Sequence, residues 1–148
     1  MKGKTEAFQF SPTTLRSFSK YYREQPAESE TDGYEKNSVG RIIRRADDQT
    51  IGRKHYLRLN GNRQSNPDDG YNFRCRGLIQ ITGYEKYHEL MDEYPKYWEG
   101  APPDTTSDPD KINEMPYAIR SALWFGSDIN PIMQIKVEAI LMLPMLHE

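Results

Sequence analysis

The chain has 148 residues, a formal net charge of −2 at pH 7 and a sequence pI near 6.0, which excludes a protein that binds nucleic acid through a strongly basic overall charge. Charged residues make up 28% of the chain, but ten tyrosines, five phenylalanines and two tryptophans favour a folded chain over a disordered one. The length fits a single domain, 1–148, with a modest core.

Cysteine content and the N-terminal sequence bear on the cellular compartment. Cys75 is the single cysteine of the sequence, so no intramolecular disulfide can form and no oxidising compartment is needed. Residues 1–6 are not followed by the apolar segment of a secretory signal peptide. We therefore expect synthesis in the cytoplasm, with any export by a route other than that signal, such as cell lysis.

The first half of the chain predicts two helices. A serine–proline pair and apolar residues at helical spacing predict a turn and then a helix over 8–22. Residues 25–38 are acidic and rich in turn-forming residues, and we expect a loop there. A second helix is expected over 47–59, where an Asp-Asp pair opens it and an Asn-Gly-Asn sequence ends it.

Positive charge is concentrated between residues 39 and 63. This basic stretch contains Arg41, Arg44, Arg45, Arg53, Lys54, Arg58 and Arg63, against Asp47 and Asp48. One interpretation is a solvated helix face. The other is attraction to an anionic polymer such as teichoic acid or the carboxylates of peptidoglycan.

The second half begins with a turn and is expected to be mostly helical. An Asn-Pro-Asp-Asp-Gly cluster over 66–70 predicts a turn, and alternating apolar residues over 71–82 predict a short extended segment. Helices are expected over 83–94 and 116–125. Residues 130–148 are apolar almost all round, which indicates either a buried core helix or a surface covered by a partner or a second copy.

One sequence run resembles a known enzyme family. Residues 69–83 read DGYNFRCRGLIQITG. This run is similar to the pattern of glycoside hydrolase family 19, the chitinases and phage-type endolysins, DG-aromatic-x-[YF]-RGRG-LIQ-[LI]-[ST]-G-x-x-NY. Upstream, Ile51, Tyr56, Gly61 and Asn62 match a second family motif, and residues 117–125 match a third, YAxRSAxWF. The three motifs occur in order over about residues 45–126.

The resemblance implies a fold and a reaction. It implies a mainly α, lysozyme-like domain in which a short extended segment, 73–82, lines a substrate groove. The implied reaction is hydrolysis of β-1,4 glycosidic bonds in chitin or bacterial peptidoglycan, by inversion and without metal or cofactor. The expected partner is therefore a polysaccharide, and neither nucleic acid nor a membrane is expected.

The resemblance also implies site residues. Gln80 and the Thr82 hydroxyl would orient substrate and the attacking water, and Tyr71, Tyr87 and Lys86 would contact sugar. Alternate residues of an extended segment share a face, and a glutamine side chain offers both donors and an acceptor to a sugar. The alternative is a buried strand in which Gln80 is satisfied within the protein. We expect Arg74 and Arg76 to hold the loop by hydrogen bonds.

The carboxylates of an inverting site are less evident. Such an enzyme needs a general acid and a base. The family's acid lies in an H-E-[ST]-x-x-[FL]-x-[FYW] motif, and residues 3–10 match its threonine and aromatics but carry Lys4 at the acid. The second carboxylate opens an E-N-L-x-Y-S stretch about nine residues on, where this chain has Thr13. Glu6 is the nearest substitute acid. Looser candidates are Glu24, Glu28 and Glu30; for each, a solvated surface glutamate is the alternative.

Three functions remain open from the sequence. The first is a family 19-type hydrolase, and the second is a catalytically inactive remnant that still binds glycan. A carboxylate pair facing Gln80 and Thr82 would separate these two. The third is a small nucleic-acid-associated protein that uses the basic stretch over 39–63, whose binding would be salt-dependent.

Overall fold

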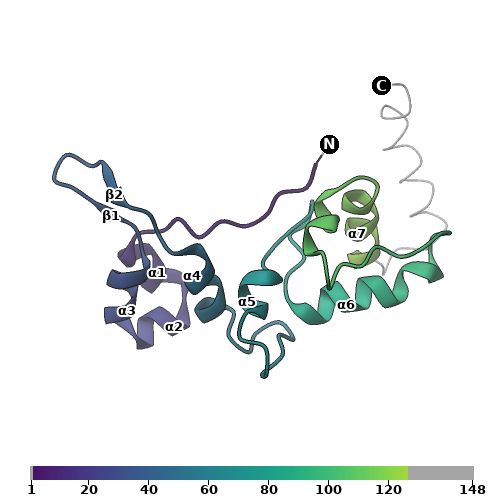
Figure 1. The fold of residues 1–148 in the computed structure, drawn as a ribbon, viewed down its shortest axis with the longest axis horizontal. Coiled ribbons are helices and arrows are strands. Elements are labelled where there is room, and N and C mark those ends of the chain that lie inside the picture. Colours follow the sequence, from purple (N-terminus) through teal and green to yellow (C-terminus); the bar gives the residue numbers. More distant parts are fainter. Residues whose placement is uncertain (1, 127–148) are drawn as a thin grey trace.

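The computed structural model describes residues 2–126, and these form a mainly α fold with one two-stranded antiparallel sheet (Figure 1). The elements are α1 (Pro12–Phe18), α2 (Lys20–Glu24), α3 (Pro26–Asp32), β1 (Glu35–Lys36), β2 (Ile42–Arg44), α4 (Asp48–His55), α5 (Asp69–Asn72), α6 (Tyr84–Glu93), η1 (Tyr94–Lys96), η2 (Pro109–Asn113) and α7 (Tyr117–Phe125). The expected mainly α class is confirmed. None of the described helices is long and apolar enough to cross a membrane. The apolar segment 130–148 lies outside the described residues.

The helices gather into two lobes, with α5 between them (Figure 1). The first lobe holds α1 to α4 and the hairpin of β1 and β2, and the second holds α6 and α7. Each lobe has its own buried apolar cluster. The first cluster is Phe8, Leu15, Tyr22, Ala46 and Ile51. The second is Phe73, Ile81, Tyr87, Leu90, Tyr94, Trp98, Ile112 and Trp124.

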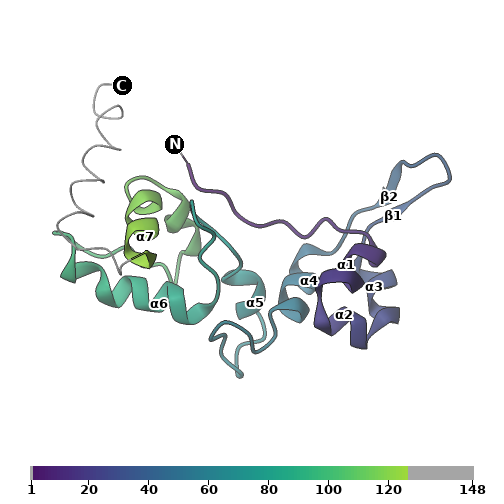
Figure 2. The same cartoon turned by 180° about the vertical axis from the view of Figure 1, so that it is seen from behind.

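An extended N-terminal segment runs along both lobes (Figures 1 and 2). The Gly3 amide donates to the Asn113 carbonyl at 3.1 Å in the second lobe, and the Glu6 amide donates to the Cys75 carbonyl at 2.8 Å. Further along, Phe8 is fully buried in the first cluster. These contacts place residues 4–6 directly beside the family 19-like run.

Side-chain capping explains where two helices, α1 and α4, begin. The Ser11 hydroxyl accepts from the Thr14 amide, and Asp47 caps α4 by accepting from Thr50. Both starts agree with the sequence analysis, and α6 spans the region expected over 83–94. Helix α4 ends at His55, four residues before the expected end at 59.

The loop prediction over 25–38 is wrong, because Pro26–Asp32 forms α3 and the β1 strand follows it. Long-range pairing stabilises this acidic helix. Lys54 on α4 lies 3.0 Å from Glu28 and 2.6 Å from Asp32, and the buried Tyr22 hydroxyl donates to Asp32 at 2.9 Å. The acidic side chains thus face a cation that local sequence does not reveal.

The extended segment expected over 71–82 is also wrong. Its first residues belong to α5, and the rest folds as a tight turn closed by one antiparallel bridge between Arg76 and Ile81. Gln80 has a φ of 58° and Gly77 a φ of 87°, so the chain reverses instead of continuing as a strand. The Gly77 position is crowded, since a Cβ there would lie 2.9 Å from Ile112.

Candidate functional site

The turn and the start of α6 form one wall of a cavity of about 300 Å³. We call it the Gln80 cavity; it is lined by Asn60, Gly61, Gln80, Thr82, Glu85, Lys86 and Phe125. The structure therefore brings together Gln80, Thr82 and Lys86, although not through the shared strand face that the sequence pattern suggested. Asn60 and Gly61 come from the loop after α4, which packs against the start of α6.

Gln80 is held firmly at the cavity edge. Its Nε2 donates to the Lys4 and Gly77 carbonyls, each at 3.0 Å. The side chain is exposed, and no hydrogen bond from a described residue reaches its Oε1. An oriented amide with an open acceptor suits a sugar hydroxyl or the N–H of an acetamido group.

Thr82 connects the cavity to groups behind it. Its hydroxyl donates to the Gln80 carbonyl at 3.0 Å and lies 2.7 Å from the Cys75 sulfur. Burial raises the pKa of the Cys75 thiol, so this group stays a neutral thiol at ordinary pH. The Cys75 sulfur also lies 3.4 Å from the Tyr56 hydroxyl.

Glu6 lies at the far end of this chain of contacts. The Tyr56 hydroxyl donates to both carboxylate oxygens at 2.9 Å, and the Cys75 amide donates to Oε2 at 3.2 Å. Burial of the Tyr56 ring, followed by the neighbouring Cys75 and Glu6, raises the pKa of the Tyr56 hydroxyl. Glu6 is thus a half-buried, oriented carboxylate, connected to Thr82 through Cys75, and not a solvated surface glutamate.

Glu85 is the carboxylate that lines the Gln80 cavity, and the sequence analysis missed it; Glu6 does not line this cavity. It lies in the first turn of α6, and its side chain folds against Gly61, where any Cβ would collide with it. Lys86, next to it, is ion-paired with Glu89 at 3.0 Å. The signal available in the sequence was the position of Glu85, three residues after Thr82.

The looser acid candidates are all in the first lobe. Glu24 lies 3.8 Å from Lys20, Glu28 lies 3.0 Å from Lys54, and Glu30 lies 2.9 Å from Arg16. None of them lines the Gln80 cavity.

The two tyrosines do not join this cavity. Tyr87 is fully buried, its hydroxyl donates to the Arg74 carbonyl, and burial raises its pKa to about 12. The expectation that Tyr87 contacts sugar is therefore wrong; its helical spacing reflects core packing. Tyr71 lines a separate cavity and stacks on Arg74, whose guanidinium carbon lies 3.9 Å from the ring centre.

Arg74 and Arg76 hold the loop, as expected. Arg74 donates to the Glu6 carbonyl at 3.0 Å and to the Tyr71 carbonyl at 2.9 Å. Arg76 is buried, and it donates to the Asn72 carbonyl and to Asp110. Both side chains serve the architecture of the turn.

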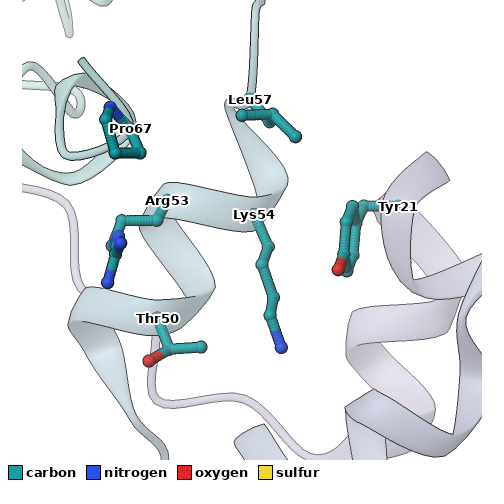
Figure 3. A pocket seen from close by; sticks show the side chains of 6 residues that line it. All are labelled: Tyr21, Thr50, Arg53, Lys54, Leu57 and Pro67. Atoms are coloured by element: carbon teal, nitrogen blue, oxygen red, sulfur yellow. The ribbon is translucent and has the colours of Figure 1, made fainter. Parts of the chain in front are cut away.

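The basic stretch over 39–63 does not form one cationic face. Arg53 pairs with Asp68 at 3.1 Å, Arg63 with Asp69 at 2.8 Å, and Arg44 with Glu35 at 3.4 Å. Lys54 is also paired, and it extends from α4 toward Tyr21 in a second cavity of about 270 Å³ (Figure 3). The cations at that cavity are neutralised within the chain, which gives an anionic polymer little to bind there.

No group of three or more metal-ligating side chains occurs within the part of the chain that the structure describes. Comparison with protein-family models and with curated proteins finds no match for the chain.

Proposed function

We propose that this chain is a lysozyme-like domain of the family 19 glycoside hydrolase type that binds β-1,4-linked N-acetylhexosamine polymers, chitin or peptidoglycan. The Gln80 cavity is the binding site. The observation that carries the proposal is that Gln80, Thr82 and Lys86, identified by the motif resemblance, line one cavity although no shared strand aligns them. Convergent polar groups in a concave site are typical of ligand recognition.

Titration with N-acetylglucosamine oligomers and with muropeptides tests the binding. Gln80→Ala removes the open acceptor and should weaken binding roughly tenfold, since losing a partner of a desolvated polar group costs ~1–3 kcal/mol. Gln64→Ala is the matched control, because Gln64 is exposed and does not line the cavity. Equal affinity for the two variants, with both still folded by circular dichroism, would contradict the binding site.

A second function, hydrolysis, is favoured by the position of Glu6. The E-N-L-x-Y-S pattern of the second carboxylate also fits residues 6–11, Glu-Ala-Phe-Gln-Phe-Ser, with Glu6 first, an aromatic for the tyrosine, and Ser11 last. In this register Glu6 is the base and not the substitute acid. Glu6 does not line the Gln80 cavity itself, and what supports this role is that Cys75 contacts both Glu6 and Thr82.

The acid half of the site is not matched in the same way. In the register that makes Glu6 the base, Lys4 no longer aligns with the acid. Glu85 lines the Gln80 cavity but is solvent-exposed, whereas a general acid is usually held in an apolar environment that keeps it protonated. A substrate with an activated leaving group does not need protonation. We therefore expect slow release of dinitrophenol from a dinitrophenyl β-chitobioside, without cleavage of chitin.

Glu6→Gln tests the base. Release of dinitrophenol should fall roughly a hundredfold, within the range that general-base catalysis contributes. Glu24→Gln is the control, because Glu24 is exposed on α2 and pairs with Lys20. If the two variants release dinitrophenol at the same rate, Glu6 is not the base, and glycan binding is the remaining proposed function of the site.

A further inference from the structure

The hairpin of β1 and β2 extends beyond the helices of the first lobe (Figures 1 and 2). All residues over 35–45 are exposed, and we call them the 35–45 hairpin. Arg44 anchors its base by donating to the Glu30 and Gly33 carbonyls at 2.6 and 2.9 Å. The hairpin is thus a fixed projection from the first lobe.

The 35–45 hairpin displays aliphatic side chains to water. Val39 is 83% exposed, Ile43 59% and Ile42 49%. Its tip is ordered by Asn37, whose Oδ1 accepts from the Val39 amide at 3.1 Å and the Arg41 amide at 3.0 Å. A preformed turn loses little conformational entropy on docking, so these side chains are presented ready for an apolar environment.

Positive charge surrounds these aliphatic residues. Lys36, Arg41 and Arg45 lie on the same hairpin, and no ion pair among the described residues involves any of them; the paired hairpin arginine is Arg44, with Glu35. The hairpin therefore combines exposed aliphatic surface with cations that no described carboxylate neutralises, of which Lys36 lies 5.2 Å from the centre of the Tyr34 ring. A partner must offer both negative charge and an apolar phase.

We propose that the 35–45 hairpin docks on the surface of an anionic lipid bilayer. Val39, Ile42 and Ile43 enter the boundary of the acyl chains, while Lys36, Arg41 and Arg45 contact headgroup phosphates. A hydrated polyanion such as nucleic acid or teichoic acid would use the cations but leave the aliphatic side chains exposed. The hairpin contains no aromatic side chain that could stack on bases or sugars.

This inference is independent of the glycan site, because the hairpin contributes no residue to the Gln80 cavity. It also replaces the sequence-based expectation that no membrane is involved. The proposed contact lies on the bilayer surface.

Sedimentation of the full chain with vesicles tests the proposal. The chain should bind vesicles of equimolar phosphatidylglycerol and phosphatidylcholine, bind more weakly at high salt, and not bind phosphatidylcholine alone. The double variants Val39→Ser/Ile43→Ser and Arg41→Ser/Arg45→Ser should each weaken binding by roughly tenfold or more. Leu59→Ser and Arg23→Ser, exposed outside the hairpin, are the controls for apolar and cationic side chains.

A direct reporter is the variant Val39→Trp. Its fluorescence should shift to shorter wavelength with the anionic vesicles only, as the indole leaves water. If Val39→Ser/Ile43→Ser binds these vesicles as tightly as the wild type, the hairpin does not insert and the proposal is overturned. It is equally overturned if vesicle binding is absent and the same variant instead dissolves a dimer seen by analytical ultracentrifugation.

Discussion

Asp69→Asn offers a sharp test of how the loop beside the Gln80 cavity is held. Asp69 is 2% exposed and accepts three hydrogen bonds from Arg63: from Nη2 at 2.8 Å, and from Nε and the backbone amide at 2.9 Å each. Asparagine keeps the shape but removes the negative charge and turns an amide donor toward the guanidinium. The variant therefore leaves Arg63 without its carboxylate.

The expected loss in the free energy of unfolding follows from how deeply the ion pair between Asp69 and Arg63 is buried. Breaking a buried ion pair by removing one partner costs ~3–5 kcal/mol. Arg63 is 41% exposed, so water partly solvates its charge, and we expect a loss of about 2–3 kcal/mol in the free energy of unfolding. The adjacent Asp68 is the matched control, because its pair with Arg53 has exposed fractions of 53% and 43%. Asp68→Asn should cost less than ~1 kcal/mol.

Urea unfolding followed by circular dichroism and tryptophan fluorescence measures both variants. Similar slopes and a midpoint lowered only in Asp69→Asn would support the reasoning. If the two variants have the same midpoint, the bidentate pair contributes no more than a surface ion pair, and the argument from burial fails.

Three further predictions use other features of the chain. The pKa of Tyr87 is raised from 10.0 to about 12, so the stability that the protonated hydroxyl contributes is complete below pH 10 and is lost as the pH rises toward 12. Tyr87→Phe should therefore make the urea midpoint depend less on pH over this range. The purified chain should show little or no release of reducing ends from chitin or clearing of permeabilised cells, and turnover within about tenfold of a complete family member would contradict this. Deleting residues 130–148, which lie outside the described residues, should relieve self-association in ultracentrifugation; a monomer that the deletion merely destabilises would identify that segment as core.

Sequence reasoning succeeded where a local signal decides the structure. The starts of α1 and α4 follow from capping by Ser11 and Asp47. It failed for α3, whose acidic side chains are matched by Lys54 from another helix. It also failed at the turn containing Gln80, since an apolar run with branched residues resembles a strand whether or not its backbone reverses.

In the candidate site, too, the features set by local sequence were predictable and those set by long-range contacts were not. Gln80, Thr82 and Lys86, which the motif identifies, line one cavity, because their positions relative to the start of α6 are fixed locally. The contacts of Glu6 with Tyr56 and Cys75 join residues 50 or more positions apart along the chain, and no periodicity reports them. Tyr87 was misplaced because a motif match names a residue without showing whether its side chain is buried in the core.

These long-range contacts connect the site to the fold as a whole. Residues 4–6 bind the turn through the Gln80 amide and the Cys75 backbone, and a few residues later Phe8 is packed in the first lobe. Under the proposed function, a glycan in the Gln80 cavity would bind the folded chain only, and by mass action it would stabilise the arrangement in which this segment lies against the turn. The same segment supplies Glu6, whose carboxylate is linked to Thr82 through Cys75 only while the N-terminal segment and the turn are held together.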